Sequence, residues 1–199
     1  EADVFSLVVS NFTSVKEIQD INPKGIILSG GPSSVYEDNA PKCDARIFDL
    51  GIPILGICYG MQLIADFFGG KVMPSIKKEF GNATFRTTSK VALFKNVKNK
   101  NEFNVWMSHS DKVIKNPPGF TTIGYSKNTK NAAIYNAKKN IYCLQFHPEV
   151  THTNNGKIII SNFLYEVCGC KKTWTTTNII KDISCTLKDQ VGDKKVILA

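Results

Sequence analysis

Short apolar runs separated by turn residues dominate the first third of the chain. Residues 4–9, 25–28 and 52–55 are largely aliphatic, and a helix-sized segment, residues 14–20, lies between the first two runs. Because the runs are apolar almost throughout instead of alternating, they are typical of strands covered on both faces in a parallel sheet. The pattern predicts an α/β fold with helices on both sides of the sheet.

The pattern changes in the middle of the chain. Residues 71–135 contain short alternating segments, such as 90–94 and 104–107, separated by Asn, Lys and Pro, and these predict antiparallel additions. The apolar run 141–146 then returns to the central sheet, and residues 156–167 carry a helical period. The expected fold class is a three-layer αβα architecture with a mostly parallel central sheet and a small antiparallel β addition.

Composition narrows the class of protein. A length of 199 residues with 42% hydrophobic content is enough for one domain with a full core and a short appendage. The six cysteines form neither a C-x-x-C pair nor a disulfide framework, which favours a reducing compartment. Cys168 and Cys170 have no histidine nearby in the sequence and no second pair, so we expect no metal. Neither a signal peptide nor a membrane span is predicted, and we expect a cytosolic protein.

The formal net charge of +8 comes largely from Lys/Asn-rich segments such as residues 95–101 and 127–131. A nucleic-acid surface combines lysines with arginines and stacking aromatics. Both segments lack arginine, and the chain contains just Arg46 and Arg86. We therefore expect solvated loops here and no nucleic-acid binding.

Cys58 lies in the sequence GICYG, residues 56–60, between the run 52–55 and a helix-like stretch that begins at Met61. A sharp strand-to-helix turn needs small residues on either side of its central residue, as in the G-x-S-x-G elbow. Such a turn places Cys58 at a helix N-terminus, where unpaired N–H groups and the dipole favour a thiolate. Free cysteine is also often simply buried, so Cys58 alone leaves both interpretations open.

His147 and Glu149 directly follow the run 141–146, with Pro148 between them. Proline fixes φ, so an extended backbone places the two side chains on the same side. Open α/β sheets also keep their sites at the carboxyl ends of strands. A thiol nucleophile in acyl transfer needs a base and an acid that fixes the tautomer of the base. A lone His-Pro-Glu would be explained by packing, but together with a cysteine elbow it indicates these two roles.

A turn with two glycines, residues 29–32, follows the second apolar run. One of its N–H groups, together with that of Tyr59, is suited to an oxyanion, although an ordinary turn explains the same sequence. We expect Gln62, one turn into the elbow helix, to face the same pocket. The polar cluster 108–111 offers backbone and carboxylate partners for an α-amino acid, and we expect His109 to orient this loop.

The segments SGGP, GICYGMQ and HPE, in this order, resemble the class I glutamine amidotransferases, and the resemblance covers nearly the whole chain. It implies the family's flavodoxin-like fold. It also implies that Cys58 attacks the side-chain amide of L-glutamine, that His147 protonates the departing ammonia and then activates water, and that Glu149 orients the histidine. The resemblance assigns the oxyanion hole to Gly31 and Tyr59, and the substrate's amino-acid end to Gln62, Ser108, His109 and Asp111.

Residues 22–35, 106–113 and 168–175 resemble the branch of this family that forms GMP. In that branch ATP adenylates XMP, and ammonia from the amidotransferase domain displaces AMP to give GMP. Ser110 stands where this branch usually carries glycine, which would alter the φ preference of the loop.

The same resemblance implies a domain organisation. Residues 1–170 would be the amidotransferase domain, lacking the family's first strand and helix. Residues 171–199 would be a connector and, at 195–199, the first strand of an absent ATP pyrophosphatase (synthetase) domain of the same polypeptide. We expect no cofactor in the amidotransferase domain, ATP and magnesium in the synthetase domain, and a homodimer of the full-length protein.

Three other interpretations are weaker. A cysteine α/β-hydrolase also uses a G-x-C-x-G elbow, but there the acid precedes the histidine by a long stretch. Another branch of the family, serving anthranilate, CTP or carbamoyl phosphate synthesis, does not explain residues 168–175. A non-enzymatic docking module would have lost at least one of Cys58, His147 and Glu149, and all three are present.

Overall fold

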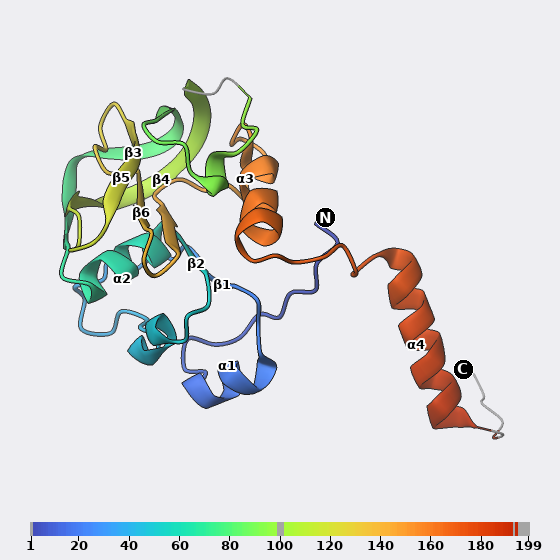
Figure 1. Ribbon diagram of the computed structural model, residues 1–199. Coiled ribbons are helices and arrows are strands. Elements are labelled where there is room, and N and C mark those ends of the chain that lie inside the picture. The colour runs from blue at the N-terminus through green and yellow to red at the C-terminus, as the bar shows by residue number, and fades with distance from the viewer. Residues whose placement is uncertain (1, 99–101, 193, 195–199) are drawn as a thin grey trace. The chain divides into compact units, whose positions relative to one another are not determined.

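The computed structural model of the chain describes residues 2–98, 102–192 and 194 (Figure 1). It divides into two compact units. The larger is Val9–Gly169, and the smaller combines Glu1–Val8 with Cys170–Ala199. The predicted strand at 195–199 lies outside the described residues.

A seven-stranded sheet organises the larger unit, in the order β1-β2-β7-β6-β5-β3-β4. The β1–β2 and β2–β7 pairs are parallel, and the remaining four pairs are antiparallel. The strands are β1 (Ile26–Leu28), β2 (Ile54–Ile57), β3 (Lys71–Thr87), β4 (Glu102–Lys115), β5 (Thr121–Ser126), β6 (Ala133–Asn136) and β7 (Ile141–Leu144).

The α/β class is confirmed, but the prediction of a mostly parallel sheet is wrong. The stretch predicted as a small antiparallel addition, residues 71–135, supplies four of the seven strands to the same sheet. Two of them, β3 and β4, are 17 and 14 residues long and pair along most of their length. Local patterning indicates antiparallel strands but does not fix which sheet edge they join, and this explains the error.

The helical elements are α1 (Val15–Ile21), the 3₁₀ turns η1 (Ala45–Asp49) and η2 (Ala92–Phe94), α2 (Tyr59–Phe67), α3 (Gly156–Asn162) and a π-helical turn, η3 (Phe163–Val167). Ser14 begins α1 with a capping box: its hydroxyl accepts from the N–H of Glu17, whose carboxylate accepts from the N–H of Ser14. The helices predicted from residues 14–20 and 156–167 are therefore confirmed.

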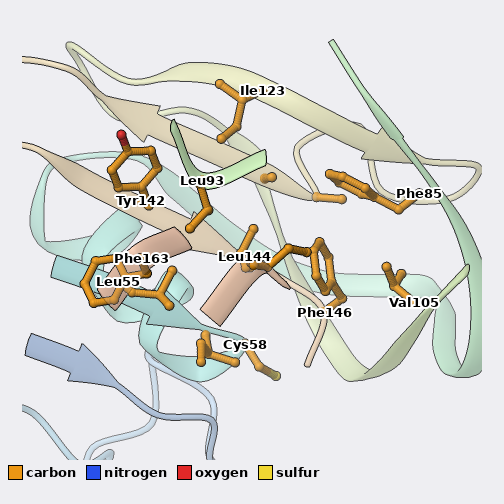
Figure 2. Packing of buried hydrophobic residues seen from close by; sticks show 14 of the residues in the cluster. Leu55, Cys58, Phe85, Leu93, Val105, Ile123, Tyr142, Leu144, Phe146 and Phe163 are labelled. Atoms are coloured by element: carbon orange, nitrogen blue, oxygen red, sulfur yellow. The ribbon is translucent and has the colours of Figure 1, made fainter. Parts of the chain in front are cut away.

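Two apolar clusters cover opposite faces of the sheet. Leu55 and Leu144 pack with Phe163 of η3 on one face (Figure 2). Ile54 packs with Ile64 of α2 on the other face, because neighbouring residues of a strand point in opposite directions. Figure 1 shows α2 and α3 on opposite sides of the strands. This arrangement confirms the three layers.

Two predicted strands are not strands. Residues 4–9 form none, and Val8 is 94% exposed. An apolar run is a strand only where a neighbouring backbone pairs with it, and composition does not supply that neighbour. The segment 90–94 contains the 3₁₀ turn η2 instead, in which the N–H of Phe94 donates to the backbone oxygen of Val91 at 3.0 Å and Leu93 is buried.

The Lys/Asn-rich segment 127–131 is not simply a solvated loop. Thr129 and Asn131 are buried, and the amide of Asn131 donates to the backbone oxygen of Val113 at 3.0 Å. The other basic segment, 95–101, is described only as far as residue 98.

The smaller unit contains α4 (Thr176–Val191), a helix where the sequence predicted a connector. Thr175 caps it by accepting from the N–H of Asn178. Three apolar side chains spaced along it are more than half exposed: Ile180, Ile183 and Leu187. Within the ranges that the structure describes, no helix is long and apolar enough to cross a membrane.

Candidate active site

Cys58 forms a one-residue turn between β2 and α2. Its backbone has φ 51° and ψ −105°, and its N–H donates to the carbonyl oxygen of Leu144 at 2.7 Å. A Cβ on Gly60 would lie 2.2 Å from the backbone oxygen of Leu28, and one on Gly56 would lie 2.9 Å from that of Gly60. The glycines of the predicted elbow are thus needed for close backbone approach. The residue with positive φ in this turn is Cys58 and neither of the two glycines.

His147 and Glu149 lie in the turn that follows β7. The carboxylate of Glu149 is 2.6 Å from Nδ1 of His147, as the sequence predicted for an orienting acid. The N–H of His147 donates to the backbone oxygen of Trp106 at 3.0 Å, and the hydroxyl of Thr153 donates to the backbone oxygen of His147 at 2.6 Å. The imidazole is therefore held through both its backbone and its ring.

The side chains of Cys58 and His147 lie together above Gly30. A Cβ on Gly30 would lie 2.9 Å from Cε1 of His147 and 3.5 Å from Cβ of Cys58. The interaction with Cys58, followed by the hydrogen bond to Glu149, raises the pKa of His147 to about 10 although burial acts in the opposite direction. Nε2 of His147 is buried and has no hydrogen-bond partner among the described residues, so it is the nitrogen left for proton transfer.

The carboxyl group of Glu149 responds to the same histidine. Burial raises its pKa, but the hydrogen bond to His147 outweighs that effect and leaves the pKa lowered. A thiol, an imidazole and a carboxylate held in this sequence are suited to nucleophilic attack on an acyl carbon and to proton transfer to a leaving group.

The glycine turn 29–32 packs on the start of α2. The backbone oxygen of Ser29 accepts from the N–H of Gly60 at 3.2 Å, and a Cβ on Gly31 would meet the Tyr59 side chain at 3.6 Å. Among the described residues, neither the amide of Gly31 nor that of Tyr59 donates a hydrogen bond. Gly31 therefore lies against the Tyr59 side chain, and the amides of both residues are unengaged within the described part of the chain.

Ser108, one of the predicted substrate-binding residues, contacts the nucleophile, and the side chains of the other three are linked to neighbouring groups. The thiol of Cys58 lies 3.6 Å from the backbone oxygen of Ser108. Gln62 is 3% exposed, and its Nε2 donates to the backbone oxygen of Asp111 at 3.0 Å. This hydrogen bond from the side-chain amide of Gln62 therefore helps to hold the 108–111 segment in place.

The carboxylate of Asp111 is held by the loop that follows β1. The hydroxyl of Ser34 donates to one oxygen, and the phenol of Tyr36 donates to the other at 2.8 Å. Neither Ser34 nor Tyr36 was predicted from the sequence. Nothing in a serine- and tyrosine-containing loop distinguishes a carboxylate ligand from a surface residue.

His109 is buried between two acceptors. Its Nδ1 lies 2.8 Å from the backbone oxygen of Asp111, and its Nε2 lies 3.2 Å from the carboxylate of Glu79. The ring is therefore held by an acceptor at each of its two nitrogens. Ser126 and Thr129 also donate to Glu79, and the hydrogen bonds from His109 and both hydroxyls lower its pKa against the effect of burial.

Ser110, which stands at a position where glycine is usual, does not have positive φ and lies within β4. The segment 108–111 is therefore part of a strand and not the loop that the sequence predicted. Within the described part of the chain, no group of three or more His, Cys, Asp or Glu side chains is arranged to hold a metal ion.

Comparison with known sequences decides the family. The family described as "Glutamine amidotransferase class-I" matches residues 1–167. The chain belongs to the class I glutamine amidotransferases. The amidotransferase domain spans most of the chain, including every candidate site residue discussed above.

The amidotransferase has close curated relatives. It is 58% identical to "GMP synthase [glutamine-hydrolyzing]" of Prochlorococcus marinus subsp. pastoris MED4 and 47% identical to the protein of the same name from Synechococcus sp. CC9311. Each match covers 100% of this chain and 38% of the relative. The chain therefore spans 38% of the length of these relatives.

Solved structures agree with the amidotransferase fold. A GMP synthase component from Thermoplasma acidophilum is similar with a TM-score of 0.72 and 30% identity, covering 89% of this chain and 83% of that one. A glutamine amidotransferase from Thermotoga maritima has a TM-score of 0.64 at 20% identity, over 78% of this chain and 80% of that one, which supports the fold alone.

Proposed function

We propose that this amidotransferase domain hydrolyses L-glutamine through a thioester on Cys58 and supplies the ammonia to a synthetase that forms GMP. The observation that carries the proposal is the placement of Cys58, His147 and Glu149. β2 and β7 are parallel neighbours, with Ile57 opposite Leu144, so the cysteine and the histidine follow adjacent strand ends. Glutamine hydrolysis needs a thiolate, a proton donor and an orienting carboxylate at one place.

In the first half of the reaction, the Cys58 thiolate attacks the side-chain carbonyl carbon of glutamine. The oxyanion that forms accepts hydrogen bonds from the amides of Gly31 and Tyr59. The carbon–nitrogen bond then breaks as His147 gives its Nε2 proton to the departing nitrogen, and ammonia leaves. Glu149 keeps the proton on Nδ1 and stabilises the charged ring.

In the second half, the neutral His147 takes a proton from water, and the resulting hydroxide attacks the thioester carbon. The carbon–sulfur bond breaks, glutamate leaves and Cys58 returns as a thiolate beside a protonated histidine. The substrate's amino-acid end lies along the 108–111 segment, with its ammonium group near the carboxylate of Asp111 and Gln62 supporting the segment.

The names and lengths of the relatives support the rest of the proposal. Both relatives above are described as glutamine-hydrolysing GMP synthases, and both are much longer than this chain. We propose residues 1–170 as the amidotransferase domain and residues 171–199 as the connection to a synthetase domain. That domain would bind ATP, magnesium and XMP, and the full-length protein would be a homodimer.

The test is Cys58→Ala in the full-length protein, with Cys185→Ala as the matched control because Cys185 is exposed in α4. Cys58→Ala should abolish GMP formation from glutamine and leave formation from added ammonium largely intact, whereas the control should keep both. Loss of both activities in Cys58→Ala contradicts the division of labour. The glutamine-like electrophile acivicin should label Cys58 alone, and peptide mass spectrometry that finds it spread over several cysteines counts against the proposal.

A further inference from the structure

Gln145 is a polar residue inside the apolar run that becomes β7 and the turn after it. It is fully buried, and its N–H donates to the backbone oxygen of Ala132 at 2.8 Å. Its side chain lies beside the nucleophile: Nε2 is 3.8 Å from Sγ of Cys58, and Oε1 accepts from Nε2 of Gln62 at 3.4 Å. A buried amide with these contacts needs an explanation beyond packing.

We propose that Gln145 is a further residue of the nucleophile site, whose side-chain N–H donates to the Cys58 sulfur and stabilises its thiolate form. The inference rests on the proposed function, because it concerns the same sulfur. It adds a contact to the reacting atom that is separate from those of His147.

The polar surroundings of the sulfur explain why such a donor is needed. The backbone oxygen of Ser108 lies 3.6 Å from Sγ and is an acceptor, so it interacts favourably with the thiol S–H and unfavourably with a thiolate. Nε2 of Gln145 is a donor and interacts in the opposite sense. Loss of the proton therefore removes the contact with Ser108 and strengthens the one with Gln145.

The orientation of the Gln145 amide is fixed by its neighbour. Gln62 points its Nε2 at both the backbone oxygen of Asp111 and Oε1 of Gln145. Turning the Gln145 amide over would bring N–H groups of Gln145 and Gln62 face to face and present an oxygen to the sulfur. The hydrogen bonds that Gln62 donates to Asp111 and Gln145 thus keep the side-chain N–H of Gln145 directed at the sulfur of Cys58.

The test compares two replacements of similar length. Gln145→Met keeps the size of the side chain without the N–H donor, and Gln145→Glu replaces the donor with a carboxylate. Asn162→Leu is the control, because it removes another buried amide, one that donates to the backbone oxygens of Leu93 and Lys95. The measurement is the rate of Cys58 alkylation by iodoacetamide between pH 5 and 9, with the modified site identified by peptide mass spectrometry.

Gln145→Met should slow alkylation at pH 7 about tenfold and move the midpoint of the pH profile up by about one unit, because the thiolate loses a hydrogen-bond donor. Gln145→Glu should slow it further, and Asn162→Leu should keep the wild-type profile. Wild-type profiles in both Gln145 variants overturn the proposal. If Gln145→Met does not fold, the side-chain NH₂ signals of Gln145 in NMR spectra decide, because they should shift with pH in the wild type but not in Cys58→Ala.

The two proposals fail separately. Alkylation needs no glutamine, so a Gln145 effect on Cys58 in a protein that does not hydrolyse glutamine supports this inference and contradicts the proposed function. Normal glutamine hydrolysis and normal alkylation in Gln145→Met contradict this inference alone.

Discussion

The parallel and antiparallel halves of the sheet hold their proposed site residues in different ways. In the parallel half, β1, β2 and β7, the nucleophile is positioned by close backbone contacts that leave no room for a side chain at Gly60. In the antiparallel half, β6, β5, β3 and β4, the segment proposed to hold the substrate is positioned by a buried hydrogen bond between His109 and Glu79. The position of the nucleophile therefore depends on steric fit, and the position of the substrate segment depends on a buried hydrogen bond.

The largest loss of stability is expected when a side chain is added at Gly60, in the parallel half. In Gly60→Ala, the new Cβ would lie 2.2 Å from the backbone oxygen of Leu28, and backbone atoms do not move aside easily. The free energy of unfolding should fall by about 3 kcal/mol or more, as measured by denaturant titration. Gly31→Ala is the control, because its Cβ would make ordinary contacts at 3.6 Å, and a loss of equal size there would contradict the steric explanation.

A somewhat smaller loss of stability is expected from a substitution in the antiparallel half. Glu79→Gln replaces the buried carboxylate that accepts from His109, Ser126 and Thr129, and it should cost about 2 kcal/mol of stability because part of this hydrogen-bond network is lost. The same change should raise KM for glutamine more than it lowers kcat, since the 108–111 segment would lose its support. Steady-state kinetics in which kcat falls and KM stays constant would refute this assignment.

The sign of the pH dependence follows from the direction of the Glu79 shift. Because the pKa of Glu79 is lowered in the folded protein, its contribution to stability is present above the ordinary value of 4.5 and is lost as the pH falls below it. The stability difference between wild type and Glu79→Gln should therefore be constant from pH 5 to 7 and shrink below pH 4.5.

The last expected effect is spectroscopic and concerns the ring of His147. NMR titration should give this ring an apparent pKa near 10, and the chain's three histidines can be assigned with single variants. Glu149→Gln should lower the pKa, and Cys58→Ala should lower it more, because Cys58 makes the larger contribution. Since the pKa is raised, the stabilising contribution is complete below pH 6.5 and is lost as the pH rises through about 10. A wild-type pKa near 6.5 would rule out the close pairing with the thiol.

Much of the parallel half could be predicted from the sequence. Strands buried on both faces, such as β2 and β7, need continuous apolar runs, and the elbow needs glycine at positions 56 and 60, so these two strands and Cys58 left clear patterns. The run that became β1 is also apolar, although Ile27 is 45% exposed. His147 and Glu149 follow a strand end directly, and their hydrogen bond agrees with the expected spacing.

The antiparallel half left weaker signals. Glu79 follows two lysines, and a charged run of this kind is typical of a solvated surface, so its burial depends on partners from β4 and β5 that no local pattern reveals. Gln145 did leave a signal, because a polar residue in an otherwise apolar strand is expected to be buried with a partner. The identity of its partners, Gln62 of α2 and Cys58, depends on the fold, which brings α2 beside the end of β7.

The register of β2 against β7 determines where the nucleophile lies relative to the histidine. Ile57 lies opposite Leu144, and the N–H of Cys58 reaches the oxygen of that same leucine. Successive residues of a strand face opposite ways, so one residue added between Leu144 and His147 would carry the imidazole away from the sulfur while the apolar layers stayed packed. Such a protein would keep its fold and lose the pairing of Cys58 with His147.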